Sequence, residues 1–374
     1  GDRVLQALDP WQALALGDTP DPKDTAGDLR VRVEGDILRL PDGTLLSPLT
    51  YPAAMAAARE ALRQALAAAP RPLLGAVLFD GEGVIWAENF AGPGPSSTMA
   101  MTPPPPETPW PLGAMSRLVA TLAILTLVDR GLVDLDAPLV TYVPEFRLAE
   151  PGYRQISARQ LLAQTAGLAG EEARNASTFQ PVPVFAHQVL HGLRVQRLKH
   201  PPGEMAIPCG DCFTLLERLV AAVTGSAYAD FVRQELLGPL DMAHSGFGDQ
   251  VSTVGTPLPL RRSDGRPWPS FQLNAFASRG LQASLGDLGR LGVMLINQGQ
   301  VGGRRLLSAA AFAELTGPPA GAGPAAGAGP GAEAGAGPGA GVVAGTRNAA
   351  GDPGRIPLLG AGQPPGLGWN SVTQ

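Results

Sequence analysis

The chain has 374 residues, of which 44% are hydrophobic, and a formal net charge of −5. This length allows one large domain or two ordinary ones, each with a sizeable core. The hydrophobic content excludes a chain that is disordered throughout. A mildly acidic charge gives no electrostatic basis for binding nucleic acid or an anionic membrane surface. Two cysteines are too few for a disulfide framework.

The longest apolar run, residues 118–128, is interrupted only by Thr121 and Thr126. It is shorter than the ~18–20 residues of a membrane-spanning helix, so we expect no membrane span. No cationic segment followed by an apolar run opens the chain. Because the chain starts at Gly1, we interpret it as a fragment or processed form, and its compartment stays unknown.

Residues 1–72 are expected to form an N-terminal extension with one hairpin and one helix. Alternating apolar residues at 29–40 end at the turn pair Asp42-Gly43, which is typical of a hairpin. Residues 52–69 are rich in alanine and keep their larger apolar side chains on one face, so they predict a helix.

Residues 73–92 predict a second hairpin, because two apolar runs flank the sequence DGEG at 80–83. A proline-rich loop follows. Residues 112–131, LGAMSRLVATLAILTLVDRG, then show the apolar spacing of a helix. A hairpin followed by a helix favours a mixed α+β domain.

Further helices are predicted at residues 158–164, 212–224, 228–237 and 285–297. Residues 317–345 differ in composition, because they consist almost entirely of glycine, alanine and proline. Such a segment lacks the large apolar side chains that offset the entropy of ordering, so we predict a disordered insertion there.

Four phrases, in order along the chain, carry a family resemblance. They are GAMSRLVATLAILTLVDRGLVDLDAPLVTYVPEF (113–146), ISARQLLAQTAGL (156–168), HPPGEMAIPCGDCFTLLERLVAAVTGSAYADFVRQELLGPLDM (200–242) and RGLQASLGDLGRLGVMLINQGQVGGRRLLS (279–308). Together they resemble the serine β-lactamase-related family, which includes class C β-lactamases, penicillin-binding-protein-like hydrolases and esterases. The resemblance covers residues 73–316 and the phrase GLGW at 366–369.

The resemblance implies an α+β fold, with a mainly antiparallel sheet, helices packed on it and an inserted helical subdomain. Residues 73–374 would form this β-lactamase-related domain, and residues 132–278 would hold most of the helical subdomain.

The family's chemistry depends on a serine in an S-x-x-K motif at the start of a helix, with the lysine one turn later on the same side. Aligned from LVDRG at 127–131, the motif becomes Ala114-Met115-Ser116-Arg117. Alanine has no hydroxyl to attack with. Arginine, whose pKa exceeds ~12, cannot act as a neutral base at pH 7.

The second motif of the family is Y-x-N, whose phenol relays a proton and whose amide holds the substrate. Here the aligned residues are Pro208-Cys209-Gly210, so Pro208 and Gly210 offer neither group. A third motif, K-T-G or H-x-G, would lie beyond Gln374. The family phrase HTSG is also altered, to QTAG at 164–167.

Ser116 is a weak candidate for a displaced nucleophile, because Val119, three residues later, is not a base. A capping or first-turn role for Ser116 is favoured. Cys209 and Cys212 form a C-x-x-C at a helix start, which suits a redox pair or half of a zinc site. We favour instead two small, partly buried residues entering a helix.

His187 and His191 would share one face of a helix, without the further ligands of a metal site. We therefore predict neither a metal nor a cofactor.

The favoured hypothesis is a catalytically inactive domain that serves as a scaffold, binding or regulatory module of a larger protein. Its partner would be another protein or another domain of the parent chain. Arg117, if it points into the pocket, would favour a small acyl or carboxylate ligand. The alternative is a serine hydrolase (esterase, amidase or β-lactamase-like) that uses an unrecognised nucleophile.

Overall fold

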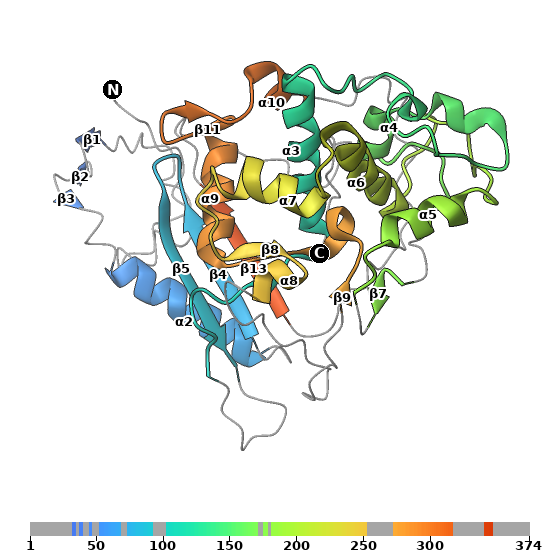
Figure 1. The fold of residues 1–374 in the computed structure, drawn as a ribbon. Coiled ribbons are helices and arrows are strands. Elements are labelled where there is room, and N and C mark those ends of the chain that lie inside the picture. Colours follow the sequence, from blue (N-terminus) through green and yellow to red (C-terminus); the bar gives the residue numbers. More distant parts are fainter. Residues whose placement is uncertain are drawn as a thin grey trace, which may run out of the picture.

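The computed structural model describes residues 32–34, 37–39, 45–46, 52–68, 73–92, 102–170, 175–178, 181–252, 272–316 and 340–346. Within these residues the fold is α+β, with helices packed on a sheet and on one another (Figure 1). No helix in these residues is long and apolar enough to cross a membrane.

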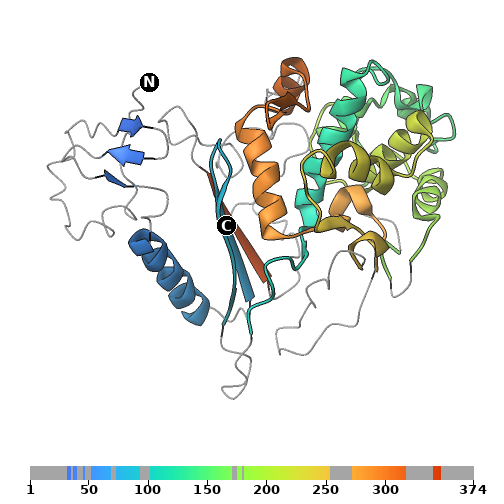
Figure 2. The same cartoon turned by 60° about the vertical axis from the view of Figure 1, so that its left-hand side comes forward.

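A three-stranded sheet lies between two helices. Strands β4 (Leu73–Phe79) and β5 (Val84–Ala91) pair antiparallel, as the sequence predicts, and β13 (Ala340–Thr346) lies parallel to β4. Helix α2 (Pro52–Ala68) covers one face and helix α9 (Leu285–Ile296) covers the other (Figure 2). Both helices were predicted from their apolar spacing.

Strand β4 is buried on both faces, so its alternating side chains enter two different cores. Leu74 and Ala76 pack with Leu66 of α2 in a small cluster. Leu73 and Val77 belong to the main core, which extends through the helices on the other face. The sheet therefore separates a minor core from the major one.

Helix α3 (Ser116–Asp129) is the centre of the major core and follows a 3-10 turn, η2 (Gly113–Met115). Its residues from Ser116 to Leu127 are all buried, as expected for a helix whose side chains are mostly apolar from Leu118 onward. Helix α3 contacts α6 (Gly210–Thr224), α10 (Ala309–Thr316) and the π-helical turn η6 (Phe276–Gly280).

The remaining helical elements include those predicted at residues 158–164 and 228–237. They are η3 (Leu139–Thr141), η4 (Pro151–Gln155), α4 (Ala158–Leu162), α5 (Phe185–Leu193), α7 (Tyr228–Val232), η5 (Arg233–Leu237) and α8 (Asp249–Ser252). The short strands pair in the orders β6-β10-β8, β7-β9 and β11-β12. They are β6 (Trp110–Pro111), β7 (Ser177–Thr178), β8 (Ser245–Phe247), β9 (Gln272–Leu273), β10 (Leu281–Ala283), β11 (Gln300–Val301) and β12 (Arg304–Arg305).

The hairpin predicted to turn at Asp42-Gly43 is present, because residues 37–39 pair antiparallel with residues 45–46, but one further strand precedes it. Three strands, β1 (Arg32–Glu34), β2 (Ile37–Arg39) and β3 (Leu45–Leu46), form a small antiparallel sheet in that order. The expected first arm is thus two strands, which are separated by Gly35-Asp36. A glycine followed by aspartate is itself a turn signal.

The predicted disordered insertion, residues 317–345, needs a correction at its end. Residues 340–345 belong to β13, which pairs with β4 over its whole length. The sequence GVVAG at 341–345 contains two valines, a residue type that favours strands. Residues 317–339 and the phrase GLGW at 366–369 lie outside the described residues.

Candidate functional site

The residues aligned with the nucleophile motif lie where η2 passes into α3. Ala114 and Met115 are exposed in η2, whereas Ser116 and Arg117 are buried in the first turn of α3. The exposed methyl group of Ala114 offers no atom that could attack a carbonyl carbon.

The hydroxyl of Ser116 is fully buried and makes two hydrogen bonds. It donates to the carbonyl oxygen of Gly113 at 2.7 Å and accepts the backbone N–H of Leu281 at 2.9 Å. Both partners are backbone groups, and neither can act as a base toward its proton. Ser116 thereby joins the start of α3 to strand β10, which is 165 residues away in the chain.

The side chain of Arg117 is held inside the protein, since the residue is only 6% exposed. Its Nη1 donates to Oε1 of Gln164 at 2.9 Å. Its guanidinium carbon lies 5.1 Å from the ring centre of Phe213, which is within the range of a cation–π contact. The guanidinium group therefore has protein partners on two different elements, α6 and the segment after α4.

Gln164 connects three segments around this guanidinium group. Besides binding Arg117, its Oε1 accepts the backbone N–H of Cys209 at 3.1 Å, and its own carbonyl accepts the N–H of Ile207 at 3.0 Å. Its φ angle of 60° is unusual for a residue with a side chain, and the residue is buried. The sequence marked this position only as the altered first residue of QTAG.

The residues aligned with the second motif precede α6. Pro208 is exposed, and Gly210 is buried with its N–H donating to the carbonyl of Gly170 at 3.2 Å. Cys209 is the N-cap of α6, where its sulfur accepts the N–H of Cys212 at 3.1 Å. The two cysteines form a disulfide.

The expectation that the two cysteines are partly buried is therefore wrong. Cys209 is 2% exposed and Cys212 is 1% exposed, because the first turn of α6 lies in the main core. Within the described residues no group of three or more histidine, cysteine, aspartate or glutamate side chains could hold a metal ion. His187 and His191 are both exposed on α5.

The structure brings Arg117, Gln164 and Cys209 into one buried cluster, while Ala114 and Pro208 lie at the surface. This cluster provides hydrogen bonds and positive charge. Its only sulfur is part of the disulfide, so it presents no nucleophile beside a base.

The buried carboxylate of Glu217 helps to fix the wall next to Ser116. Oε1 of Glu217, on α6, accepts the N–H of Ala277 in η6 at 2.7 Å. Tyr228 is also buried near this wall, and burial, followed by the charge of Glu217, raises its pKa well above the usual value. A neutral phenol is therefore strongly favoured at this position.

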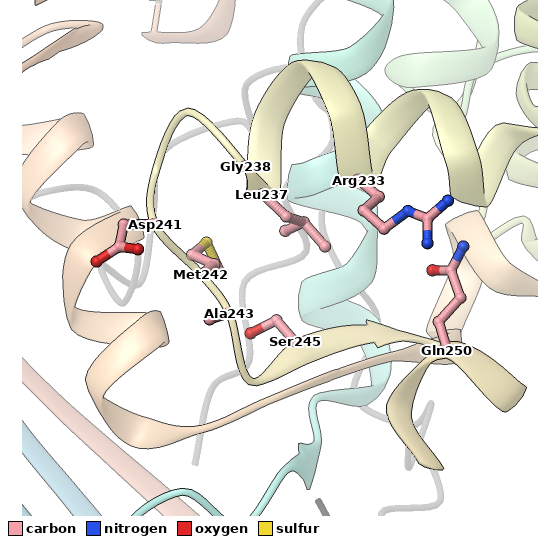
Figure 3. Close-up of a pocket in the computed structure, with 8 residues that line it drawn as sticks. All are labelled: Arg233, Leu237, Gly238, Asp241, Met242, Ala243, Ser245 and Gln250. Carbon is pink, nitrogen blue, oxygen red and sulfur yellow. The ribbon is translucent and has the colours of Figure 1, made fainter. Parts of the chain in front are cut away.

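A pocket of about 230 Å³ lies between η5 and β8, on residues that the sequence did not single out (Figure 3). Leu237 and Met242 form its apolar part, and Arg233 and Gln250 lie together at one end. Ser245 also lines it. Arg233, Leu237 and Met242 belong to the family phrase at 200–242, but their residue types gave no signal for a pocket.

The hydroxyl of Ser245 is committed to the fold. It donates to Oδ2 of Asp287 at 2.7 Å, and the same oxygen accepts the backbone N–H of His244 at 2.7 Å. Asp287 is fully buried, and its other oxygen accepts a hydrogen bond from Arg290 at 2.6 Å. The carboxylate of Asp287 thus lies behind the pocket, where it holds the Ser245 hydroxyl, the His244 N–H and the Arg290 guanidinium group in place.

The helices packed on an antiparallel hairpin, with a core helix at the expected nucleophile position, define a protein of the serine hydrolase fold of penicillin-binding proteins. The sequence profile of the Beta-lactamase family matches residues 58–366, so the chain belongs to that family.

Similar proteins agree with this assignment. The chain is 29% identical over 264 residues to human beta-lactamase-like 1, an alignment that covers 69% of this chain and 52% of the human protein. It is 25% identical over 142 residues to the penicillin-binding protein PbpX of Bacillus subtilis, covering 38% of this chain and 34% of PbpX. The chain thus spans about half the length, or less, of these curated relatives.

Solved structures share the fold at lower identity. The octameric penicillin-binding protein homologue of Pyrococcus abyssi matches with a TM-score of 0.56 and 21% identity, over 70% of this chain and 60% of that one. A D-stereospecific amidohydrolase of Streptomyces matches with a TM-score of 0.55 and 21% identity, over 69% of this chain and 77% of that one.

Proposed function

We propose that this chain is a member of the Beta-lactamase family that does not hydrolyse acyl substrates and that serves as a scaffold or binding module of a larger protein. The observation that carries the proposal is the state of the nucleophile helix. Ala114 stands at the aligned nucleophile position, and the nearby Ser116 hydroxyl is buried between two backbone partners.

The neighbouring positions support the same proposal. Arg117 stays charged at neutral pH and cannot accept the proton that a lysine amine accepts. Pro208 and Gly210 have no side chain that relays a proton. Most residues of α3 from Leu118 to Leu127 are apolar and buried, which supports a chain whose packing role is kept.

We propose a protein partner or another domain of the parent chain as the binding partner. A small acyl or carboxylate ligand would use the guanidinium group of Arg117. Arg117 is only 6% exposed, and its guanidinium group donates a hydrogen bond to Gln164. Binding of a ligand would require this group to give up its buried hydrogen bond to Gln164. This cost favours the protein partner.

The alternative is a serine hydrolase with an unrecognised nucleophile, and turnover assays separate the two. A chromogenic β-lactam and a p-nitrophenyl ester are offered to the wild-type chain, to Ser116→Ala and to the double variant Ala114→Ser/Arg117→Lys. We expect wild type and Ser116→Ala to equal the rate in buffer. Turnover by wild type that is lost in Ser116→Ala would contradict the proposal.

The double variant tests the alignment itself. It restores a hydroxyl in the exposed turn η2 and an amine in the buried first turn of α3, at the positions that the family uses. Acylation of this variant by the β-lactam, with none in wild type, would support the assignment of Ala114 and Arg117 to the lost motif.

A further inference from the structure

The disulfide between Cys209 and Cys212 lies at the junction of the candidate site. Cys209 immediately follows an exposed segment, in which Met205 is 47% exposed and Pro208 is also exposed. The disulfide is thus buried, but the residue directly before Cys209 in the chain lies at the surface. The first turn of α6, to which both cysteines belong, is also the turn that supports Arg117 through Phe213.

We infer that Cys209 and Cys212 form a reversible redox site whose substrate is a dithiol, and that its oxidation state controls how firmly Gln164 and Arg117 are held. This inference does not depend on whether the chain hydrolyses acyl compounds. It uses a pair of side chains that the proposed function leaves without a role.

The reaction balances as a thiol–disulfide exchange. A thiolate of the dithiol attacks one sulfur of the pair, the bond between the two cysteine sulfurs breaks, and its electron pair stays on the departing cysteine sulfur. The second thiol of the reductant then attacks the mixed disulfide. The products are two cysteine thiols and one cyclic disulfide, and the two protons of the dithiol end on the two cysteines.

The surroundings suit a departing sulfur at Cys209. As the N-cap of the 15-residue helix α6, this sulfur accepts the N–H of Cys212, and a helix N-terminus favours negative charge. The charged side chains nearby are Arg117, joined to the same segment through Gln164, and Asp211 in the first turn of α6. The arginine favours negative charge at Cys209, and a charged aspartate opposes it.

The disulfide is coupled to the site through backbone geometry. It closes the first turn of α6 and fixes the position of the Cys209 N–H, which donates to Oε1 of Gln164. The same oxygen also accepts a hydrogen bond from Nη1 of Arg117. When the bond between the sulfurs is broken, Cys209 gains rotational freedom at its N-cap position. Oε1 of Gln164 then no longer has the Cys209 N–H held in a fixed position as a donor.

The test starts from the oxidised wild-type chain and uses dithiothreitol as the dithiol. Alkylation followed by intact-mass measurement counts thiols without denaturant, and near-ultraviolet circular dichroism monitors the fold. Hydrogen exchange is measured on peptides that cover residues 160–170 and 205–215. A peptide from α9, which packs on the sheet, serves as the internal control.

We expect both cysteines to become alkylated together while the fold is retained, and oxidation to restore the starting mass. Amide exchange in the two site peptides should rise about tenfold on reduction, the size of one lost hydrogen bond, with no change in α9. In the double variant Cys209→Ser/Cys212→Ser, the amides of the two site peptides should exchange as fast as in the reduced chain, and dithiothreitol should not change their exchange. In Gln164→Ala, reduction should no longer change exchange at 160–170.

Two results would overturn the inference. Thiols that appear only in denaturant would show a structural disulfide that a dithiol cannot reach. Reduction of the folded chain with unchanged exchange at 160–170 would show that the redox state is not transmitted to Gln164. If the double serine variant does not fold, the comparison of oxidised with reduced wild type still decides both points.

Discussion

Replacement of Ser116 by alanine should destabilise the fold without removing any catalytic activity. The hydroxyl is fully buried and links two elements, since it donates to Gly113 and accepts from the N–H of Leu281. Alanine leaves the Leu281 N–H buried without its acceptor. The carbonyl of Gly113 loses less, because it also accepts the backbone N–H of residue 116.

The expected cost is about 2 kcal/mol of the free energy of unfolding. A buried donor that loses its partner costs about 1–3 kcal/mol, and the retained bond at Gly113 keeps the total near the middle of that range. The loss falls on the contact between α3 and β10, so hydrogen exchange should increase first in β10.

Urea denaturation measures this cost, with Ala114→Ser as the matched control. The control adds a hydroxyl at an exposed position of the preceding turn, η2, so its free energy of unfolding should stay within about 0.5 kcal/mol of wild type. If Ser116→Ala were equally neutral, the hydroxyl would not hold β10 and the structural role assigned to Ser116 would be refuted.

Two further substitutions test the packing and the buried phenol. Gly292→Ala should lower the free energy of unfolding by about 1–3 kcal/mol, because the added Cβ would lie 2.1 Å from the ring of Phe79. The control is Gly286→Ala on the same helix, whose Cβ would have no neighbouring atom closer than 4.0 Å. Urea denaturation should show no loss of stability in this control. Tyr228→Phe should keep or raise stability at neutral pH, since the phenol oxygen is buried without a hydrogen bond in the described residues. Its raised pKa means that the folded state retains the proton longer than the unfolded state, so wild type should lose stability as pH rises above about 10, the unfolded value. Thermal melting from pH 8 to pH 11 should show this loss in wild type, and a slope that persists in Tyr228→Phe would contradict the assignment to this phenol.

The sequence predicted the regular elements well where one physical signal dominated. The apolar spacing of α3 and α9 and the turn signal between β4 and β5 each depend on local residues alone. Sequence-based prediction failed where the pairing of strands depends on residues that are far apart in the chain. Strand β13 lies in a segment whose composition indicated disorder, and its pairing with β4 joins residues more than 260 positions apart.

The site was only partly accessible from sequence. Alignment identified Ala114 and Arg117, because the residue types alone show that a hydroxyl and an amine are missing at these positions. It could not show that Arg117 turns inward to Gln164, since that contact joins residues 47 apart and depends on a left-handed backbone at Gln164. The burial of Cys209 was likewise invisible, because burial depends on how α6 packs on α3.

The most direct test of the proposed function is the intact mass of the wild-type chain after incubation with a fluorophosphonate. We expect an unchanged mass, since the aligned nucleophile position holds Ala114 and the Ser116 hydroxyl is bonded to two backbone groups. A single stoichiometric adduct that peptide mapping places on Ser116 would contradict the account and establish a serine hydrolase.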